Sequence, residues 1–373
     1  MKKTVRVENN KQLKQFIDFP HELYKNDPNY VPELFIAQRD LLTKHPFLKH
    51  SEIVLFLALE DKKVVGRIAA ILNNNHNSFN GSKDGFFGFF DTINDPEVAR
   101  LLFGEAEKWL RSKNLTTVIG PVNPSTNETC GLLINGFDSP PVAMMTYNFP
   151  YYPDLVEQNG YKKKTDLLAY DFDMNDFNDK PFRLMEGFRK RLAEKGITIR
   201  RGNMKNFDQE VSGVKAAYNL AWDKNLGFVP MTDEEFKYMA KDMKMILDKD
   251  FLLVAEHEGK IIGFALCIPD INKIQIHIKK GRLLPTGIFK LLLGRKKIKG
   301  IRIIALGIVE EYRKMGIEAV FYGIIMQKAV EKGIEHTEAS WILEDNELMN
   351  RAILHIKGRP YKKYRIYEKI LKQ

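Results

Sequence analysis

The chain has 373 residues, of which 44% are hydrophobic and 28% charged, so it can bury the cores of two globular domains. Its formal net charge of +10 favours an anionic partner, which could be nucleic acid, a membrane or a polyphosphate cofactor. No stretch approaches the roughly 18 uncharged residues of a membrane span, and the N-terminus lacks a hydrophobic signal segment, so we expect a cytoplasmic protein.

The two cysteines indicate neither a zinc site nor a disulfide framework. Cys130 and Cys267 lie far apart in the sequence, without CxxC or Cys/His spacing. We therefore expect both to be small buried apolar residues, and we expect no metal in this protein.

One pattern of the first half returns in the second half. The stretches "LALEDKKVVGRIAA" (57–70) and "VAEHEGKIIGFALC" (254–267) each predict a strand, a tight polar turn and a second strand. Gly66 and Gly263 occupy the same place in the two stretches and are separated by 197 positions.

A second pair of stretches has nearly the same offset. "LVEQNGYKKKTDLLAY" (155–170) resembles "LHIKGRPYKKYRIYEK" (354–369), and an offset that is kept at both ends of a unit indicates duplication. We predict one fold used twice, with the boundary in the polar stretch "DMNDFND" and with domains 1–175 and 176–373.

The first half lacks a turn suited to phosphate. In "DTINDPEVARLL", Asp95, Pro96 and Glu97 predict a well-capped helix start that carries negative charge and no glycine. We therefore expect the first half to contribute to substrate binding or packing rather than to bind an anion.

A long loop follows in the first half, "GPVNPSTNETCGLLINGFDSPP" (120–141). One interpretation is that it shapes an acceptor pocket with Asn123, Asn127 and Glu128. An ordinary surface loop explains the same sequence equally well.

The sequence of the second half predicts a clear order of strands and helices. It begins with a strand at 197–201 and a helix marked by apolar residues from Val214 to Trp222, and Thr232 with Glu235 then predicts a capping box on a second helix. The hairpin, a strand, the helix after Gly316, another strand, a helix near Asn346 and a last strand follow. This order predicts an α/β fold with a mixed, mostly antiparallel sheet flanked by helices.

A basic segment interrupts this order at residues 271–302. It contains ten Lys or Arg and no acidic residue, and apolar residues interleave with the cations. This pattern is typical of a segment that lies in a membrane interface, so we expect peripheral contact with an anionic membrane between Lys279 and Lys299, on the inner face. A covered insertion with a solvated basic edge is an equal alternative, and nucleic acid is less favoured because Phe289 is the single aromatic residue there.

The stretch "YRKMGI" (312–317) stands between a strand and a helix and combines cations with a glycine, as a phosphate-binding turn requires. With "NRAILHIKGRPY" (350–361) and the element order, it resembles the GNAT superfamily of acyl-CoA-dependent N-acyltransferases. Two residues depart from that family's pattern. Glu318 replaces a small residue of the loop, and Leu354 stands where many members carry a proton-donating tyrosine.

The resemblance implies that acetyl-CoA or a longer acyl-CoA is the cosubstrate. The residues that would line its site are Val309, Arg313, Lys314, Met315, Gly316, Ile317, Asn346 and Asn350. The alternative for Glu318 is a first-turn acid favoured by the helix dipole, in a helix that binds nothing.

The resemblance also implies direct attack of an amine on a thioester. Such a reaction uses a base on the amine, backbone N–H groups near Val309 that polarise the carbonyl, and an acid for the leaving thiolate. Candidate bases are Glu338 and Glu344, and Tyr364 is the candidate acid in place of Leu354. Each is also of a kind that is often solvated or structural.

The tandem arrangement, "GFDSPPVAMMTYNFPYY" (136–152) and "YKKYRIYEK" resemble a bacterial group of GNAT-like proteins linked with ceramide synthesis. That resemblance implies transfer of an acyl group from CoA to an amine, such as that of a long-chain sphingoid base. Aminoacyl transfer from tRNA by a tandem GNAT-like fold is one alternative. A degenerate pair retained as a binding module without catalysis is another, favoured by Glu318 and Leu354.

Overall fold

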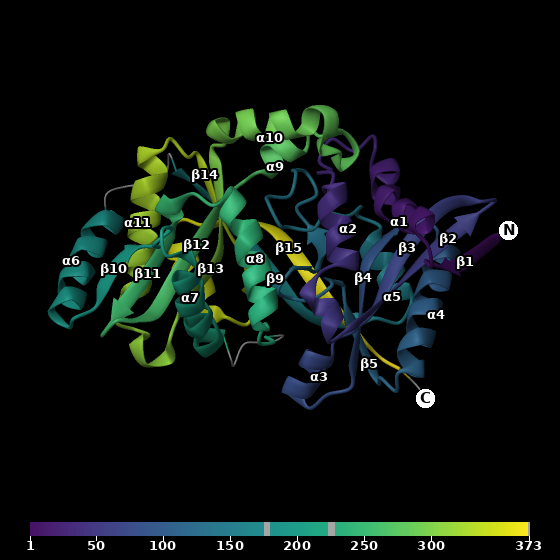
Figure 1. Ribbon diagram of the computed structural model, residues 1–373, viewed down its shortest axis with the longest axis horizontal. Coiled ribbons are helices and arrows are strands. Elements are labelled where there is room, and N and C mark those ends of the chain that lie inside the picture. Colours follow the sequence, from purple (N-terminus) through teal and green to yellow (C-terminus); the bar gives the residue numbers. More distant parts are fainter. Residues whose placement is uncertain (175–179, 223–227, 372–373) are drawn as a thin grey trace. The chain divides into compact units, whose positions relative to one another are not determined.

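The computed structural model describes residues 1–174, 180–222 and 228–371 (Figure 1). The chain forms two compact units. Unit 1 consists of Met1–Leu168, Asn272–Lys296 and Lys362–Gln373, and unit 2 consists of Ala169–Ile271 and Lys297–Tyr361. The predicted boundary between residues 175 and 176 falls outside the described residues, so the division into 1–175 and 176–373 stays a prediction.

Unit 1 is a mixed sheet with helices packed on it. Its strand order is β1-β2-β3-β4-β5-β15, antiparallel throughout except for the parallel pair β4 and β5. The strands are β1 (Lys2–Arg6), β2 (Glu52–Glu60), β3 (Lys63–Leu72), β4 (Asp84–Thr92), β5 (Thr117–Gly120) and β15 (Arg359–Ile370), with short β6 (Val122–Asn123), β7 (Thr129–Cys130) and β8 (Leu132–Asn135). The helices are α1 (Asn10–Leu23), α2 (Phe35–Thr43), α3 (Asn74–Asn80), α4 (Pro96–Ser112), α5 (Tyr152–Gln158), α9 (Asn272–Gln275) and α10 (Ile288–Gly294).

Unit 2 repeats this architecture. Its strands follow the order β10-β11-β12-β13-β14, and β13 and β14 are again the parallel pair. The strands are β10 (Thr198–Arg201), β11 (Leu252–His257), β12 (Lys260–Pro269), β13 (Gly300–Ile308) and β14 (His336–Leu343). The helices are α6 (Lys180–Glu194), α7 (Phe207–Trp222), α8 (Asp233–Ile246), α11 (Ile317–Glu331) and α12 (Glu347–His355). The predicted α/β fold class is therefore confirmed.

The duplication is visible in the geometry of the two hairpins. Strand β12 begins at Lys260, 197 positions after β3 begins at Lys63. The β2–β3 ladder has a bulge after Ala58, and the β11–β12 ladder has one after Ala255, again 197 positions later. A bulge adds one residue and bends its strand, so its recurrence at the same place indicates that both halves inherited one strand pair.

The last strand of each half joins the sheet of the other unit. Strand β9 (Lys162–Asp173) begins 197 positions before β15 and adjoins β14 in unit 2. Strand β15 instead pairs with β5 in unit 1, from Tyr367 opposite Gly120 to Ile370 opposite Thr117. The sequence similarity of these two strands did not predict the exchange.

The helix starts follow their predicted caps. Asp95 accepts hydrogen bonds from the backbone N–H groups of Glu97 and Val98 at the start of α4, with Pro96 in the first turn. At the start of α8, Thr232 and Glu235 form the complete capping box. Cys130 and Cys267 are both buried and unbridged, as predicted.

The glycine that marks the first hairpin has a packing reason. Helix α4 lies so close to β3 that a Cβ atom on Gly66 would lie 2.8 Å from Leu102 Cδ1 and 3.1 Å from Val98 Cγ1. Gly104, on the exposed side of α4, would meet nothing within 4 Å.

These two glycines should respond in opposite ways to the same substitution. We expect Gly66→Ala to destabilise the protein by about 1 kcal/mol or more through overpacking against α4. Gly104→Ala should stabilise it by roughly 0.5–1 kcal/mol, because alanine favours the helix and restricts the unfolded chain. Urea unfolding of the two variants tests this, and equal shifts in the same direction would contradict the packing described here.

Candidate functional site

The predicted phosphate turn of unit 2 leads directly into α11. Gly316 has a φ of 91°, and a Cβ atom there would lie 2.2 Å from Phe188 Cδ1, so both conformation and packing require glycine. Lys314 also has a positive φ, of 63°, and its side chain is exposed. Lys314 makes no hydrogen bond or ion pair within the described residues, so its ammonium group is available to an anion.

The start of α11 differs from the start of α4 in the way an anion site requires. Among the described residues no side chain caps the N-terminus of α11, whereas Asp95 caps α4 and is itself paired with Lys2. Uncapped N–H groups at the positive end of a helix dipole attract phosphate oxygens. The backbone of α11 thus fits a phosphate, and that of α4 does not.

Two predicted members of the phosphate turn have other roles. Arg313 donates to the carbonyl oxygens of Ile308 at 3.1 Å and Ala221 at 2.7 Å, so its guanidinium group holds the turn against α7. Val309 donates its backbone N–H to Ile262 O at 2.9 Å. Met315 and Ile317 flank Gly316, and Ile317 is fully buried.

Glu318 lies in the first turn of α11 and is half-buried. Burial raises the pKa of Tyr322, and the carboxylate of Glu318 contributes to this shift. The carboxylate of Glu318 therefore affects the ionisation of Tyr322, one turn further along α11.

The parallel strands of unit 2 diverge beside this turn. The β13–β14 register runs from Gly300 opposite His336 to Ile303 opposite Ala339, although both strands continue for several residues. In the paired part, Arg302 stands opposite Glu338. Their side chains are 2% exposed and form an ion pair at 3.6 Å, and Tyr361 also donates to Glu338. The carboxylate of Glu338 is thus held in a buried polar cluster.

The other predicted residues of unit 2 lie where β14 meets α12. Asn346 caps α12 by accepting from the backbone N–H of Met349. Asn350 donates to the carbonyl oxygens of Leu343 and Glu344, and accepts a hydrogen bond from Tyr170 at 2.9 Å. The hydrogen bonds of both asparagines stabilise this corner. Glu344 directly follows β14, and its side chain is exposed.

Tyr364 and Leu354 lie in different environments. Tyr364 is fully buried on β15 in unit 1, opposite Leu133 of β8. Leu354 is 52% exposed on α12 in unit 2. Tyr364 belongs to unit 1, whereas the two predicted bases belong to unit 2. Neither unit therefore contains both a predicted base and the predicted acid.

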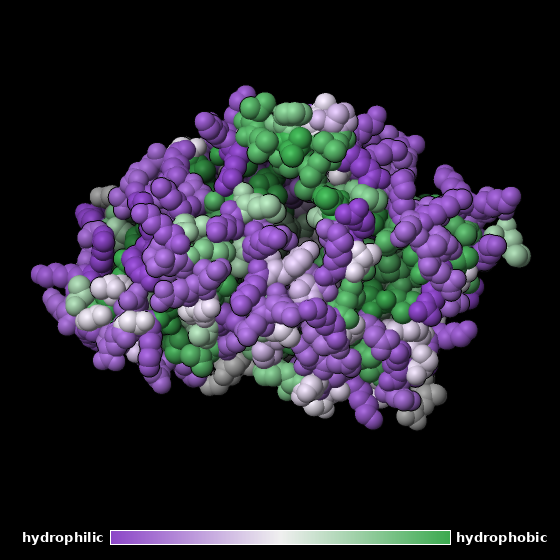
Figure 2. All heavy atoms as spheres, viewed as in Figure 1, coloured by the Kyte–Doolittle hydropathy of each residue, from purple (hydrophilic) through white to green (hydrophobic). Residues whose placement is uncertain are grey.

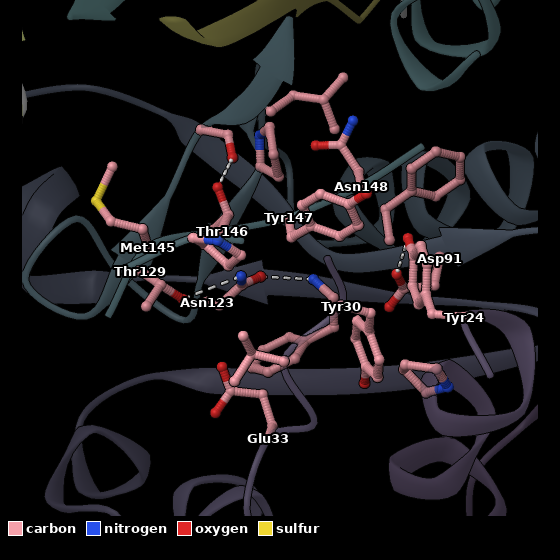
Figure 3. A pocket seen from close by; sticks show the side chains of 18 of the residues that line it. Tyr24, Tyr30, Glu33, Asp91, Asn123, Thr129, Met145, Thr146, Tyr147 and Asn148 are labelled. Atoms are coloured by element: carbon pink, nitrogen blue, oxygen red, sulfur yellow. Dashed lines mark hydrogen bonds between the residues drawn. The ribbon is translucent and has the colours of Figure 1, made fainter. Parts of the chain in front are cut away.

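The described part of unit 1 contains a pocket that the sequence predicted only in outline (Figure 3). Its cavity volume is about 110 Å³. It lies where β4 leaves β5: their register ends at Phe86 opposite Ile119, and Phe89, Phe90 and Asp91 of β4 line the pocket. The α1–α2 connection and the loop after β5 supply the other walls, which include Tyr24, Tyr30, Glu33, Asn123, Thr129, Met145, Thr146, Tyr147 and Asn148.

A buried ion pair forms one wall of this pocket. Arg67 Nε donates to Asp91 Oδ2 at 2.7 Å, and both residues are 8% exposed. Tyr24 donates to Asp91 Oδ1 at 3.0 Å, as Figure 3 shows, and Tyr24 in turn contacts the hydroxyl of Tyr152 at 2.9 Å. Burial raises the pKa of Tyr24 well above its usual value, so its hydroxyl remains a donor to this carboxylate.

Of the three loop residues predicted for an acceptor pocket, Asn123 lies in its wall. Its Oδ1 accepts from the backbone N–H of Phe89 at 2.6 Å, and its Nδ2 donates to Thr129 Oγ1 at 3.2 Å (Figure 3). Glu128 instead lies 3.3 Å from His45 Nε2, and Asn127 donates its backbone N–H to Ser125 Oγ. Neither of these two lines the pocket.

The sequence contained a signal for the ion pair that our sequence analysis did not use. Arg67 and Asp91 each stand within an otherwise apolar strand, "VVGRIAA" and "FFGFFDT". A charge that the strand pattern buries requires a partner. In the part of the chain that the structure describes, no group of three or more His, Cys, Asp or Glu is placed to hold a metal.

Comparison with known proteins identifies relatives over nearly the whole chain. No protein-family model matches it. It is 37% identical to Protein YghO of Escherichia coli over 371 residues, which cover 97% of this chain and 93% of the relative. It is 36% identical to bacterial ceramide synthase of Caulobacter vibrioides over 370 residues, which cover 96% and 95%.

Solved structures identify the fold. A tandem GNAT protein from the clavulanic acid biosynthesis pathway matches with a TM-score of 0.61 and 11% identity, and the match covers 100% of this chain and 99% of that one. The GCN5-related glucosamine N-acetyltransferase region of a fungal multi-domain β-N-acetylglucosaminidase matches with a TM-score of 0.59 and 12% identity, covering 99% of this chain and 38% of that one. The predicted GNAT fold is confirmed.

The buried ion pair of unit 1 predicts a large stability effect. Asp91→Asn leaves the buried guanidinium group of Arg67 without its counter-charge, so we expect a loss of about 3–5 kcal/mol in the free energy of unfolding. The double variant Arg67→Met, Asp91→Leu removes both charges and should lose less than Asp91→Asn alone. Urea unfolding measures both, and a wild-type midpoint for Asp91→Asn would contradict the pairing.

Proposed function

Because the chain belongs to the tandem-GNAT family that includes bacterial ceramide synthase, we propose that it transfers an acyl group from CoA to the amine of a long-chain acceptor. The observation that carries the proposal is the 36% identity to that enzyme over 96% of the chain. The GNAT fold adds an acyltransferase architecture, and a sphingoid base is the acceptor class that the relative's name suggests.

The residues at the start of α11 fit the pyrophosphate of CoA. Its uncapped N–H groups and Lys314 would hold the phosphate oxygens, while Arg313 keeps the turn in place through Ile308 O and Ala221 O. When bound, acyl-CoA supplies the thioester carbon that the amine attacks, with loss of the thiol and of one amine proton. The proposal asks the protein chiefly for binding, orientation and removal of that proton.

Of the predicted bases, we assign proton removal to Glu344 ahead of Glu338. Glu344 is exposed directly after β14, where an amine can reach it, whereas the side chain of Glu338 is only 2% exposed. Glu338 would then fix the paired part of β13 and β14. Tyr364 remains the proposed acid.

An exposed apolar surface on the inserted segment supports a long-chain acceptor. Leu284, Phe289, Leu292 and Leu293 are 76%, 60%, 68% and 76% exposed, and we call these four residues the α10 surface. Figure 2 shows a hydrophobic area at the top of the view, where Figure 1 places α10. No described helix is long and apolar enough to cross a membrane.

Cations border the α10 surface without acidic residues in the same segment. Lys290 lies within α10, and Arg295, Lys296 and Lys297 follow it directly. Apolar side chains that can enter the headgroup region, with cations beside them, are suited to an anionic lipid surface. We therefore propose that the segment between Lys279 and Lys299 contacts the membrane in which a long-chain amine resides.

The CoA part of the proposal predicts an effect at Lys314. Lys314→Gln should weaken CoA binding about fivefold, because one exposed charge contact contributes about 1 kcal/mol. Lys237→Gln, an exposed lysine on α8, is the matched control and should bind CoA as the wild type does. Isothermal titration with CoA measures both.

The same proteins test the transfer itself. Wild type supplied with a long-chain acyl-CoA and a sphingoid base should release free thiol and form an amide, detected by mass spectrometry. Absence of the amide would refute the proposed activity. Equal CoA affinity of Lys314→Gln and wild type would refute this turn as the cofactor site.

The membrane part predicts salt-dependent vesicle binding. Each cation near an anionic surface contributes about 1 kcal/mol, so Lys296→Gln with Lys297→Gln should lower binding roughly thirtyfold at low salt. Leu292→Ser with Leu293→Ser should also lower it, and neither pair should unfold the protein because these side chains are exposed. Cosedimentation with phosphatidylglycerol vesicles measures the effect.

The control for charge alone removes two cations elsewhere. Lys62→Gln with Lys63→Gln, in the β2–β3 turn and at the first residue of β3, should bind vesicles as the wild type does. Equal pelleting of all variants, or equal binding to neutral phosphatidylcholine vesicles, would contradict the proposed membrane contact. The segment would then be a structural insertion.

A further inference from the structure

The pocket of unit 1 contains one carboxylate that no described residue pairs with a charge. Glu33 lines the pocket and makes no hydrogen bond or ion pair within the described residues. The other charged side chains in the wall, Arg67 and Asp91, neutralise each other at 2.7 Å. The pocket therefore carries one uncompensated negative charge when Glu33 is ionised.

The polar side chains across the pocket are already engaged in holding its walls. In Figure 3, Glu33 lies across the hollow from Tyr147 and Asn148. Tyr147 donates to Asp27 at 2.8 Å, and Asn148 donates at 3.0 Å to the carbonyl oxygen of Leu133 on β8. These contacts make a fixed wall in the pocket that Glu33 also lines.

We propose that Glu33 binds the ammonium group of the acceptor amine in this pocket, an inference that rests on the proposed function and assigns its acceptor site. The side chain of Glu33 is exposed to solvent at the wall of the pocket, where its carboxylate can attract a cation. A protonated primary amine donates three hydrogen bonds to such a partner. Desolvation by the surrounding protein raises the pKa of Glu33, although the side chain keeps contact with solvent, and the positive charge of Arg67 partly opposes this shift.

The cavity is large enough for the amine head group of such an acceptor but too small for its hydrocarbon chain. About 110 Å³ accommodates a small polar group. The hydrocarbon chain of a long-chain amine must therefore lie outside the pocket, on an apolar surface.

The segment that carries the α10 surface also builds this pocket. Asn272 lines it and donates to Pro141 O at 2.9 Å, while Gln275 donates to Pro32 O at 3.1 Å, directly before Glu33. A Cβ atom on Gly281 would lie 1.9 Å from Glu33 O, so the segment passes against the backbone of Glu33. One stretch of chain thus supports both the carboxylate and the apolar surface suited to the chain of the acceptor.

A binding experiment without CoA tests the site. We titrate N,N-dimethyloctylamine, a tertiary amine that cannot form an amide, and 1-octanol, its neutral counterpart, into wild type, Glu33→Gln and Glu60→Gln. Glu60, at the end of β2 in unit 1, is the matched control because it lies outside the pocket. Wild type should bind the amine about tenfold more tightly than the alcohol, as expected for one charge-assisted hydrogen bond.

Glu33→Gln should lose most of this preference, and Glu60→Gln should keep it. Equal preference in Glu33→Gln and wild type, or no binding of the amine to wild type, would overturn the proposal. Thermal melting of the variants controls for folding, which we expect to be unchanged because Glu33 has no partner among the described residues. The readout is independent of transfer: Glu33-dependent amine binding without amide formation would refute the proposed activity and leave the amine site standing.

Discussion

The pairing of β15 with β5 is the interaction on which unit 1 depends. Strand β5 has only four residues, and its ladder with β4 ends at Ile119. The hydrogen-bonded ladder from Tyr367 to Ile370 covers its other edge, which would otherwise expose unpaired N–H and C=O groups. Since β15 comes from the last residues of the chain, the first half completes its sheet only when the C-terminus is in place.

The same strand fixes the loop that forms the pocket. Leu132 and Leu133 of β8 pair with Arg365 and Tyr364, and buried Lys362 donates to the carbonyl oxygens of Gly136 and Ser139. The loop after β5 is therefore held at several points along its length. A long loop with so many fixed contacts can keep a cavity open, which an ordinary mobile surface loop cannot do.

The two units share an architecture but offer different chemistry. The α11 terminus of unit 2 has a glycine and an exposed cation, and no described side chain caps it, which suits a phosphate. The α4 terminus of unit 1 is closed by Asp95, but the divergence of β4 from β5 leaves a polar cavity lined by the carboxylate of Glu33. On the functions proposed here, the same fold after duplication would bind an anion in one copy and a cation in the other.

The sequence by itself determined the local structure and the repeat. The apolar periodicity, the caps at Asp95 and Thr232 and the offset of 197 depend on interactions between residues close in the chain, and all appear in the structure. Only the tertiary structure decided that β15 pairs with β5, because β9 and β15 have similar sequences and no local pattern distinguishes their partner strands. It also decided that Arg313 holds backbone carbonyls and that Glu33 lines a pocket with Asp91. Those roles depend on residues far apart in the chain, whose proximity no local pattern encodes.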